Sequence, residues 1–258
     1  MVRSVHLQLA RLPSSLACFP RALLNKRPDV TSVADPAEFH VRVNHVQFDP
    51  AHIARYGAAC GFDAAEVRNG YVPLTYPHVL VMPLHMRIFA NASFPLRPPG
   101  LIHLTNMIAA PGQLRPGMWV NLHTCARNYR KTDAGLAFDM DTAISIDRQV
   151  VWQETCVFLS RWPPSAERPA SRPPRPPKAP KDSAVLAEVD VSSKLAWEYA
   201  RVSGDFNPIH LNDRAARYLG LRGAISHGMW SLARSIAEKP ITTAASNARL
   251  ETQFLAPV

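Results

Sequence analysis

Residues 199–229 read YARVSGDFNPIHLNDRAARYLGLRGAISHGM, and this stretch governs the interpretation of the whole chain. Pro208 interrupts any regular helix because it lacks a backbone donor, so Asp205 and His210 are expected on a bent loop. Gly204 permits a tight backbone turn just before that loop. A carboxylate and an imidazole that share one water molecule can deprotonate it and return a proton. The loop therefore carries the residue types of an acid/base site.

A second polar element, SHGM at residues 226–229, begins an apolar helix predicted at residues 223–238. A helix N-terminus leaves backbone N–H groups unpaired and carries partial positive charge. Gly228 allows a ligand to approach that backbone closely. Such a helix start can polarise a carbonyl group and stabilise an oxyanion. Taken singly, the SGD, NP and HG groups are ordinary turn or packing motifs, and the specific signal is their occurrence together in this order.

The composition sets the class of the protein. The chain has 258 residues, 47% of them hydrophobic, which is enough for one large domain or two of ordinary size. No apolar run is long enough to cross a membrane. The four cysteines are scattered and form no CxxC pair, so we expect free thiols in a reducing cytoplasm and neither a zinc site nor a disulfide framework. The net charge of +9 suits an anionic partner, whereas no motif indicates nucleic-acid binding.

A proline-rich stretch at residues 162–183 divides the chain. Proline excludes both regular helix and central strand there, so a solvated, semi-extended linker is expected. The predicted divisions are then a basic leader at 1–35, one domain at 36–161 and a second at 184–258. The leader has no acidic residue before Asp29. Its composition is open to three interpretations, namely a mitochondrial transit peptide, an ordinary basic leader or a short packing helix.

The two domains share an order of elements that suggests an internal repeat. Periodicity and turn signals predict, for the first domain, a strand at 39–48, helices at 50–59 and 76–90, and strands at 100–108, 118–128, 135–146 and 149–159. For the second they predict a strand at 185–191, helices at 193–202, 213–219 and 223–238 with an irregular stretch at 204–211, and a strand at 247–255.

Local residues support the repeat. YGAACGF at residues 56–62 can be laid on YARVSGD at residues 199–205. Phe62 then stands where Asp205 stands, and no NPxH sequence follows it. Histidines also stand near the starts of the two long helices, His78 in the first half and His227 in the second. The first domain is therefore expected to be catalytically inactive.

The combination of motifs closely resembles the MaoC-like family, the (R)-specific enoyl-CoA hydratases also called hydratase 2. The family motif runs Tyr, a few residues, Ser-Gly-Asp-x-Asn-Pro-hydrophobic-His, an alanine, and then His-Gly-Met. The matching residues here are Tyr199, Ser203, Gly204, Asp205, Asn207, Pro208, Ile209, His210, Ala216, His227, Gly228 and Met229. The segments YVPLTYPHVLVMPLHM and PGLIHLTNMI are similar to the first half of two-domain members, so the resemblance covers nearly the whole chain.

The resemblance implies an α+β double hot-dog fold, in which each half wraps a curved antiparallel sheet around a long helix. It implies Asp205 and His210 as the pair that adds water to a trans-2-enoyl-CoA to give a (3R)-3-hydroxyacyl-CoA, or that reverses this reaction. The N–H of Gly228 would be the oxyanion donor, and His227 is expected to be structural. Supporting roles fall to Tyr199, Ser203, Gly204 and Asn207. No cofactor or metal is implied, because the CoA thioester is the substrate and water the co-substrate.

The second hot dog is expected to be incomplete, because only the strand at 247–255 follows its long helix. The apolar face of the helix at 223–238 would then form an exposed patch unless something covers it. Three explanations are a truncated product of a longer gene, which we favour, a second chain that supplies the missing strands, and a non-catalytic acyl-binding subunit. Hot-dog sheet edges also commonly pair into dimers.

An acyl-CoA hydratase is the favoured function. A non-catalytic partner subunit has no need of both Asp205 and His210, and thioesterases of the same fold place their acid differently. By resemblance, the inactive first half widens the acyl tunnel, so we expect medium or long acyl chains as substrates.

Overall fold

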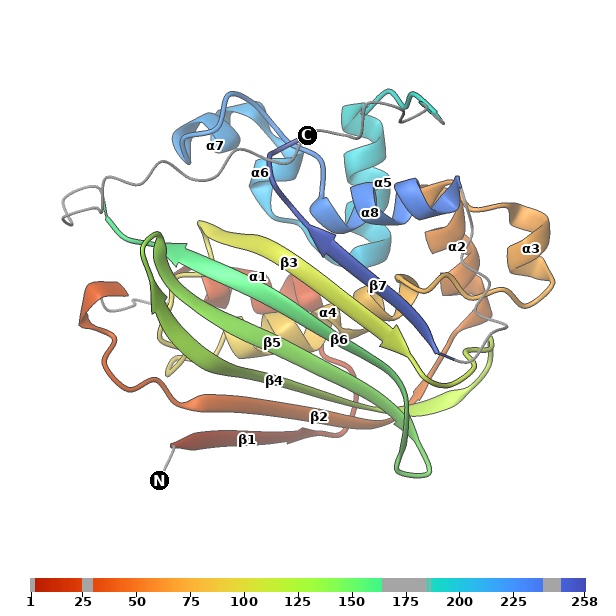
Figure 1. The fold of residues 1–258 in the computed structure, drawn as a ribbon, viewed down its shortest axis with the longest axis horizontal. Helices are drawn as coiled ribbons and strands as arrows, with labels where there is room; N and C mark the ends of the chain where they lie inside the picture. The colour runs from red at the N-terminus through yellow and green to blue at the C-terminus, as the bar shows by residue number, and fades with distance from the viewer. Residues whose placement is uncertain (1–2, 25–29, 164–184, 186, 239–246) are drawn as a thin grey trace.

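A seven-stranded sheet forms the body of the molecule, with strands in the order β1-β2-β4-β5-β6-β3-β7 (Figure 1). The computed structural model describes residues 3–24, 30–163, 185, 187–238 and 247–258. The strands are β1 (Ser4–Leu9), β2 (Glu38–Gln47), β3 (Leu101–Ala110), β4 (Trp119–Thr132), β5 (Gly135–Ile146), β6 (Gln149–Arg161) and β7 (Ala248–Gln253). β1 runs parallel to β2, and every other pair in this sheet is antiparallel.

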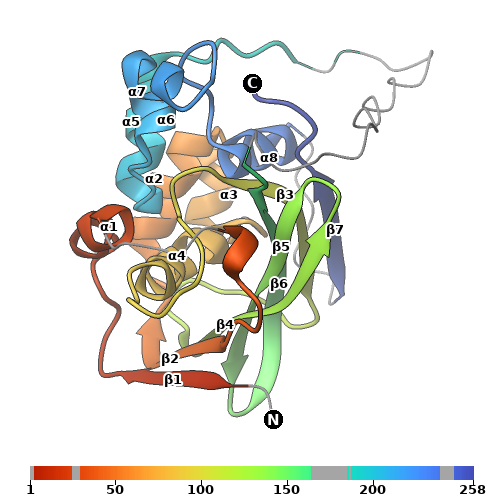
Figure 2. The same cartoon turned by 90° about the vertical axis from the view of Figure 1, so that its left-hand side faces the viewer.

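Helix α4 (Tyr76–Phe89) lies against the inner face of this sheet, as Figure 2 shows from the side. It is apolar nearly all round, which suits a helix buried between the sheet and α1. The other helices are α1 (Ser15–Leu24), α2 (Pro50–Cys60), α3 (Ala64–Arg68), α5 (Ser193–Ser203), α6 (Pro208–Leu211), α7 (Asp213–Tyr218) and α8 (Gly228–Ala237), with a 3-10 turn at Val30–Ser32. The expected α+β class is confirmed, with a long helix wrapped by an antiparallel sheet.

The predicted repeat is visible in helices α2 and α5, which pack against each other. Each ends at a glycine in the left-handed conformation, Gly61 with φ 78° and Gly204 with φ 73°. This conformation strongly favours glycine and closes the helix C-terminus. The rings of Tyr56 and Tyr199, one from each helix, lie 6.4 Å apart.

Helix α8 corrects two predictions. It begins at Gly228 rather than at residue 223, so the SHGM sequence straddles its first turn. Its apolar face is also not exposed, because Met229, Leu232 and Ile236 are all buried. The helix packs on α2 of the first half, and the indole Nε1 of Trp230 donates to the carbonyl of Ala59 at 2.9 Å. The first half therefore covers the surface that the missing strands were expected to cover.

The strand predicted at 185–191 is wrong, because residues 187–192 are neither helical nor extended in a sheet. Val189 and Val191 are 38% and 44% exposed, and within the described part of the chain no strand pairs with this segment to bury its apolar side chains. In the second half, within the described residues, β7 is the one strand, and it pairs with β3 of the first half.

Residues assigned to a basic leader form part of the folded unit. β1 extends the sheet beside β2, and α1 packs against α4. The stretch from 164 to 184, which holds nearly all of the predicted linker, lies outside the described residues. Among the described helices, none combines the length and the apolar character needed to cross a membrane.

Candidate active site

The predicted acid/base loop connects α5 to α6, and its backbone is held by its own side chains. The Oγ of Ser203, which is buried, accepts a hydrogen bond from the N–H of Asp205 at 3.1 Å. One carboxylate oxygen of Asp205 accepts from the N–H of Asn207 at 3.1 Å. The side chain of Asn207 in turn caps α6 by accepting from the N–H of Ile209. These side chains satisfy backbone donors that the bent loop would otherwise leave unpaired.

Asp205 and His210 face each other across a gap of 4.0 Å between Oδ2 and Nε2. That distance is too long for a direct hydrogen bond, but a water oxygen about 2.8 Å from each atom fits between them. Their side chains are 26% and 10% exposed, so the pair is sheltered yet open to a small reactant. The geometry therefore suits two groups that handle one shared water molecule.

The orientation of His210 is set by its other ring nitrogen. Nδ1 lies 2.9 Å from the carbonyl oxygen of Ile225, which can only accept, so Nδ1 carries the proton. In a neutral ring Nε2 is then the unprotonated nitrogen, and it points toward Asp205. This tautomer is the one that a general base requires.

The charge state of Asp205 follows from its neighbours. Burial alone would raise the pKa of Asp205, but His227, His210 and the N–H of Asn207 together hold that pKa below its usual range. The carboxylate is therefore ionised at neutral pH and can accept a proton or orient a water molecule.

His227 braces the loop against the start of α8. Its Nε2 donates to the backbone carbonyl of Asp205 at 3.0 Å, and its ring stacks on that of His210 with 3.9 Å between centroids. The ring of Tyr199, which is buried, lies 4.9 Å from it on another side. Burial lowers the pKa of His227 to about 4, so the ring is neutral at physiological pH. This arrangement matches the structural role expected of His227.

Gly228 is the first residue of α8, where a backbone N–H has no acceptor within the helix. A Cβ at Gly228 would lie 3.1 Å from the ring of Phe254, so glycine keeps this helix start compact. Ile225, whose carbonyl accepts a hydrogen bond from His210, lies three residues before Gly228. The segment that leads into α8 therefore also orients His210. The structure thus brings the two predicted elements, the loop and the helix start, into one site.

Two buried groups near this site, His78 and Glu154, have no role assigned from the sequence alone. His78, at the start of α4, lies 2.8 Å from Glu154 on the core-facing side of β6. The pKa of Asp205 is itself affected by His78, which places this pair close to the loop. The repeat had already aligned His78 with His227, and that alignment was the available signal. Glu154, in contrast, is unremarkable within its strand sequence.

Three donors of this site could geometrically contact one metal ion. Atoms of Asp205, His210 and His227 lie within 4.8 Å of one another. Two of the ring nitrogens are already donors to backbone carbonyls, His210 Nδ1 and His227 Nε2. The 4.0 Å gap is accounted for more directly by a water molecule.

Comparisons with known proteins find relatives that cover most of the chain. A family model described as a MaoC like domain matches residues 171–258. The 3-hydroxyacyl-thioester dehydratase X of Mycobacterium tuberculosis is 33% identical over 227 residues, which span 87% of this chain and 78% of that protein. The fatty acid synthase subunit beta of Saccharomyces cerevisiae is 60% identical over 35 residues, 14% of this chain and 2% of that one.

Solved structures share the fold. The crystal structure of HtdX from Mycobacterium tuberculosis matches with a TM-score of 0.69 at 30% identity, covering 85% of this chain and 83% of that chain. A MaoC-like dehydratase from Phytophthora capsici matches with a TM-score of 0.65 at 18% identity, covering 89% and 84%. The second likeness bears on the fold alone.

Proposed function

The chain belongs to the MaoC-like dehydratase family, and we propose that it interconverts trans-2-enoyl-CoA and (3R)-3-hydroxyacyl-CoA at Asp205 and His210. As a member of this family it is a hydro-lyase, an enzyme that adds or removes water. The observation that carries the proposal is the 4.0 Å distance between the Asp205 carboxylate and Nε2 of His210, which one water molecule can bridge with a hydrogen bond to each.

The proposed reaction moves one water molecule onto the enoyl thioester. With Asp205 ionised and His210 Nε2 unprotonated, the pair takes a proton from the water while its oxygen bonds to C3. The electrons of the double bond move toward the thioester carbonyl, and C2 then receives a proton from the pair. The N–H of Gly228 stabilises the negative oxygen of the enolate formed between these steps. Dehydration follows the same path in reverse.

The test follows the loss of absorbance of the conjugated enoyl thioester with purified protein. Asp205→Asn and His210→Gln are each expected to lower kcat by about 10²–10⁴-fold, the usual contribution of an acid/base residue. Asp147→Asn and His45→Asn are matched controls, because Asp147 lies in an exposed turn and His45 at an exposed bulge of β2, both far in sequence from the loop. Asparagine tolerates their positive φ of 47° and 55°. The proposal fails if the folded wild-type chain is no faster than the Asp205 and His210 variants.

The stereochemistry and chain length are separate parts of the proposal. Chiral chromatography of the released 3-hydroxy acid is expected to give the R enantiomer, and the S enantiomer would contradict the assignment. Because the first half lacks the acid/base pair, with Phe62 buried in place of an aspartate, we propose that it serves the acyl chain. Medium or long enoyl-CoA substrates should then be hydrated faster than crotonyl-CoA, and equal or better turnover of crotonyl-CoA would count against that role.

A further inference from the structure

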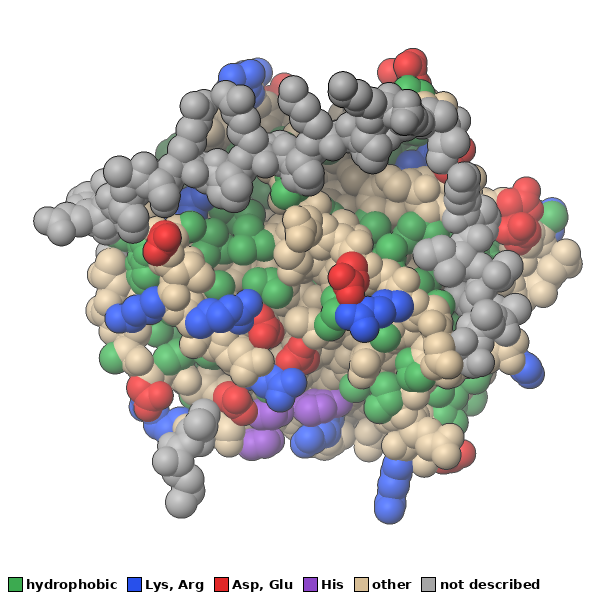
Figure 3. All heavy atoms as spheres, viewed as in Figure 1, with side chains coloured by type: hydrophobic (Ala, Val, Ile, Leu, Met, Phe, Trp, Pro, Cys, Tyr) green, Lys and Arg blue, Asp and Glu red, His purple; other side chains and the backbone are tan. Residues whose placement is uncertain are grey.

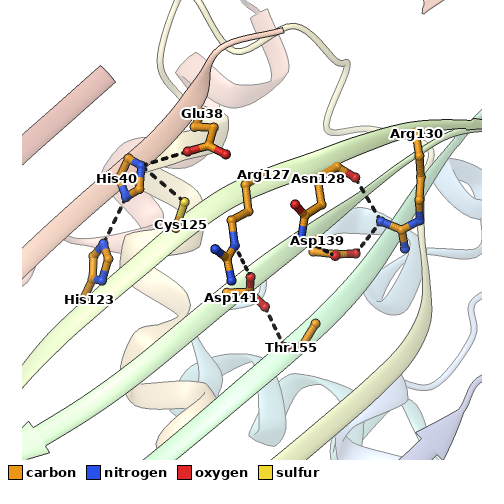
Figure 4. A network of polar contacts seen from close by, with 10 residues as sticks. All are labelled: Glu38, His40, His123, Cys125, Arg127, Asn128, Arg130, Asp139, Asp141 and Thr155. Carbon is orange, nitrogen blue, oxygen red and sulfur yellow. Dashed lines mark hydrogen bonds and ion pairs between the residues drawn. The ribbon is translucent and has the colours of Figure 1, made fainter. Parts of the chain in front are cut away.

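The outer face of the sheet, which turns away from α4, carries a cluster of ligand-type side chains. Figure 3 views this face and shows histidine side chains gathered among acidic and basic ones. His40 on β2 is the cross-strand partner of Cys125 on β4. Glu38 lies two residues before His40 on the same strand, so its side chain emerges on the same face. Figure 4 shows the three side chains converging.

The separations within this cluster match those around a tetrahedral metal ion. Nε2 of His40 lies 3.6 Å from Sγ of Cys125 and 3.4 Å from Oε2 of Glu38. Ligands at the bond lengths usual for zinc, about 2.3 Å to sulfur and about 2.0–2.1 Å to nitrogen and oxygen, are separated by about 3.5 Å and about 3.4 Å at tetrahedral angles. All three donor atoms lie within 4.8 Å of one another.

The other sulfur-containing cluster in the described residues lacks this spacing. His78 and Glu154 approach to 2.8 Å, which is the distance of a direct hydrogen bond and too short for two ligands on one ion. Asn106 closes the same group by donating to Glu154 at 2.6 Å. That cluster is therefore satisfied by its own hydrogen bonds, whereas the contacts at His40 are longer than typical N–H···O bonds.

A second histidine orients the ligand nitrogen. Nδ1 of His40 lies 3.2 Å from Nε2 of His123, the neighbouring outward-facing side chain of β4. A metal-binding histidine usually gives its other ring N–H to such an acceptor, which fixes the tautomer. With Nδ1 of His40 directed at His123, Nε2 is the ring nitrogen that faces Cys125 and Glu38.

From this geometry we propose that Glu38, His40 and Cys125 bind a zinc ion on the outer face of the sheet, with water as the fourth ligand. His40 and Glu38 are 17% and 31% exposed, which leaves room for that water. Binding replaces the thiol proton of Cys125 with a sulfur–metal bond and releases the proton to solvent. The thiolate and the carboxylate together balance the two positive charges of the ion.

The charges around the cluster are compatible with such an ion. Arg127 on the same strand as Cys125 pairs with Asp141 at 2.5 Å, which offsets the charge of that guanidinium. Arg42 also lies on β2, on the outer face, and its repulsion is the main electrostatic cost of binding. The ion would join β2 to β4 on the face opposite the proposed active site.

Cobalt(II) provides a direct test, because it binds zinc sites and its bond to a thiolate absorbs strongly in the near ultraviolet. The full chain is titrated with Co²⁺ under reducing conditions, and zinc is then added. We expect one equivalent of Co²⁺ to produce the thiolate band and zinc to displace it. Cys125→Ser should abolish the band, and His123→Ala should weaken affinity about 10–100-fold, as for other partners of metal-binding histidines.

Two control variants locate the site. Cys156→Ser removes the sulfur of the other cluster, and Asp205→Asn removes a carboxylate of the proposed active site. Both should keep the band if circular dichroism shows that they are folded. No thiolate band in the wild-type chain, or an equal band in Cys125→Ser, would overturn the assignment. If Cys125→Ser does not fold, Glu38→Gln and His40→Gln replace it in the test. Each removes one proposed ligand and must lower the affinity for Co²⁺.

Discussion

His78 donates from Nδ1 to the carboxylate of Glu154, with its two oxygens 2.8 and 2.9 Å away, and the two side chains are 3% and 0% exposed. The bond joins the first turn of α4 to the middle of β6, directly below the proposed active site. Burial alone would raise the pKa of Glu154, but His78, His85 and Asn106 outweigh burial and lower that pKa to about 2. A buried carboxylate thus stays ionised because polar partners surround it.

Removing one partner of this bond should be costly. His78→Leu leaves the Glu154 carboxylate buried without its main donor, and the free energy of unfolding should fall by about 3–5 kcal/mol. The double variant His78→Leu/Glu154→Leu removes the charge as well and should recover much of that loss. Urea unfolding measures both. Lys194→Ala is the control, because it breaks an ion pair in which the lysine is 85% exposed, and it should cost under about 1 kcal/mol. Equal losses in the single and double variants would contradict this account.

Acid should destabilise the fold in two pH ranges. Burial lowers the pKa of His85 to about 3, while the unfolded side chain has its ordinary value of 6.5. Below pH 6.5 the unfolded state therefore binds a proton at this side chain that the folded state does not bind. The free energy of unfolding falls as the pH drops from 6.5 toward 3. Glu154 adds stability above its unfolded pKa of 4.5 and loses it as pH falls toward about 2.

The two ranges can be separated with a variant. His85→Gln removes the first contribution, so its urea midpoint should change less between pH 6.5 and 5 than that of the wild-type chain. His103 and His227 have pKa values lowered to about 4 by burial and act in the same direction, so the slope should decrease without vanishing. An unchanged slope in His85→Gln would show that His85 is protonated in the folded state.

The proposed oxyanion donor can be tested by removing a single hydrogen. Proline is tolerated at the first position of a helix, and His227 before it has φ −66° and ψ 128°, which suit a residue preceding proline. Gly228→Pro removes the backbone N–H, whereas Gly228→Ala keeps it and adds a similar Cβ against Phe254. The proline variant should have a kcat about 10²–10³-fold below that of the alanine variant. Equal kcat values would exclude this N–H from catalysis.

Gly204 should be sensitive to substitution for two separable reasons. Its φ of 73° costs an L-residue roughly 1–2 kcal/mol, and an added Cβ would lie 2.8 Å from Oγ of Ser15 in α1. Gly220 has φ 85° with no atom within 4 Å of the same position, so Gly220→Ala measures the backbone cost alone. Gly204→Ala should lower the melting temperature more than Gly220→Ala does. Adding Ser15→Gly to Gly204→Ala removes the contact with the new Cβ. It should recover only the part of the loss in melting temperature by which Gly204→Ala exceeds Gly220→Ala.

The predicted acid/base loop is the part of the site whose structure the sequence predicts best. Its residues lie within one short stretch, so their approach depends on local turns, caps and glycines whose preferences are known. Helices α2, α4 and α5 and strands β2, β5 and β6 are predicted to within two residues at each end for the same reason. The assignment of Asp205 and His210 to catalysis stays a prediction, as do a dimer and a cytoplasmic location.

Contacts between distant segments are the part that the sequence does not reveal. The apolar side of α8 predicts burial without saying which surface covers it, and α2 supplies that surface. Val189 and Val191 alternate like a strand, but no neighbouring strand is there to pair with them. His40 and Cys125 become partners only through the register of β2 on β4. Cysteine spacing along the chain could not show that pairing.

Strand β7 makes the two halves of the chain structurally dependent on each other. It comes from the second half but bonds to β3 of the first, while Trp230 and His52 each form a hydrogen bond from one half to the backbone of the other. A gene split between the halves would leave the first product with an open sheet edge and the second with an apolar helix facing water. Neither fragment would be a viable protein by itself. Each half is therefore needed to stabilise the other.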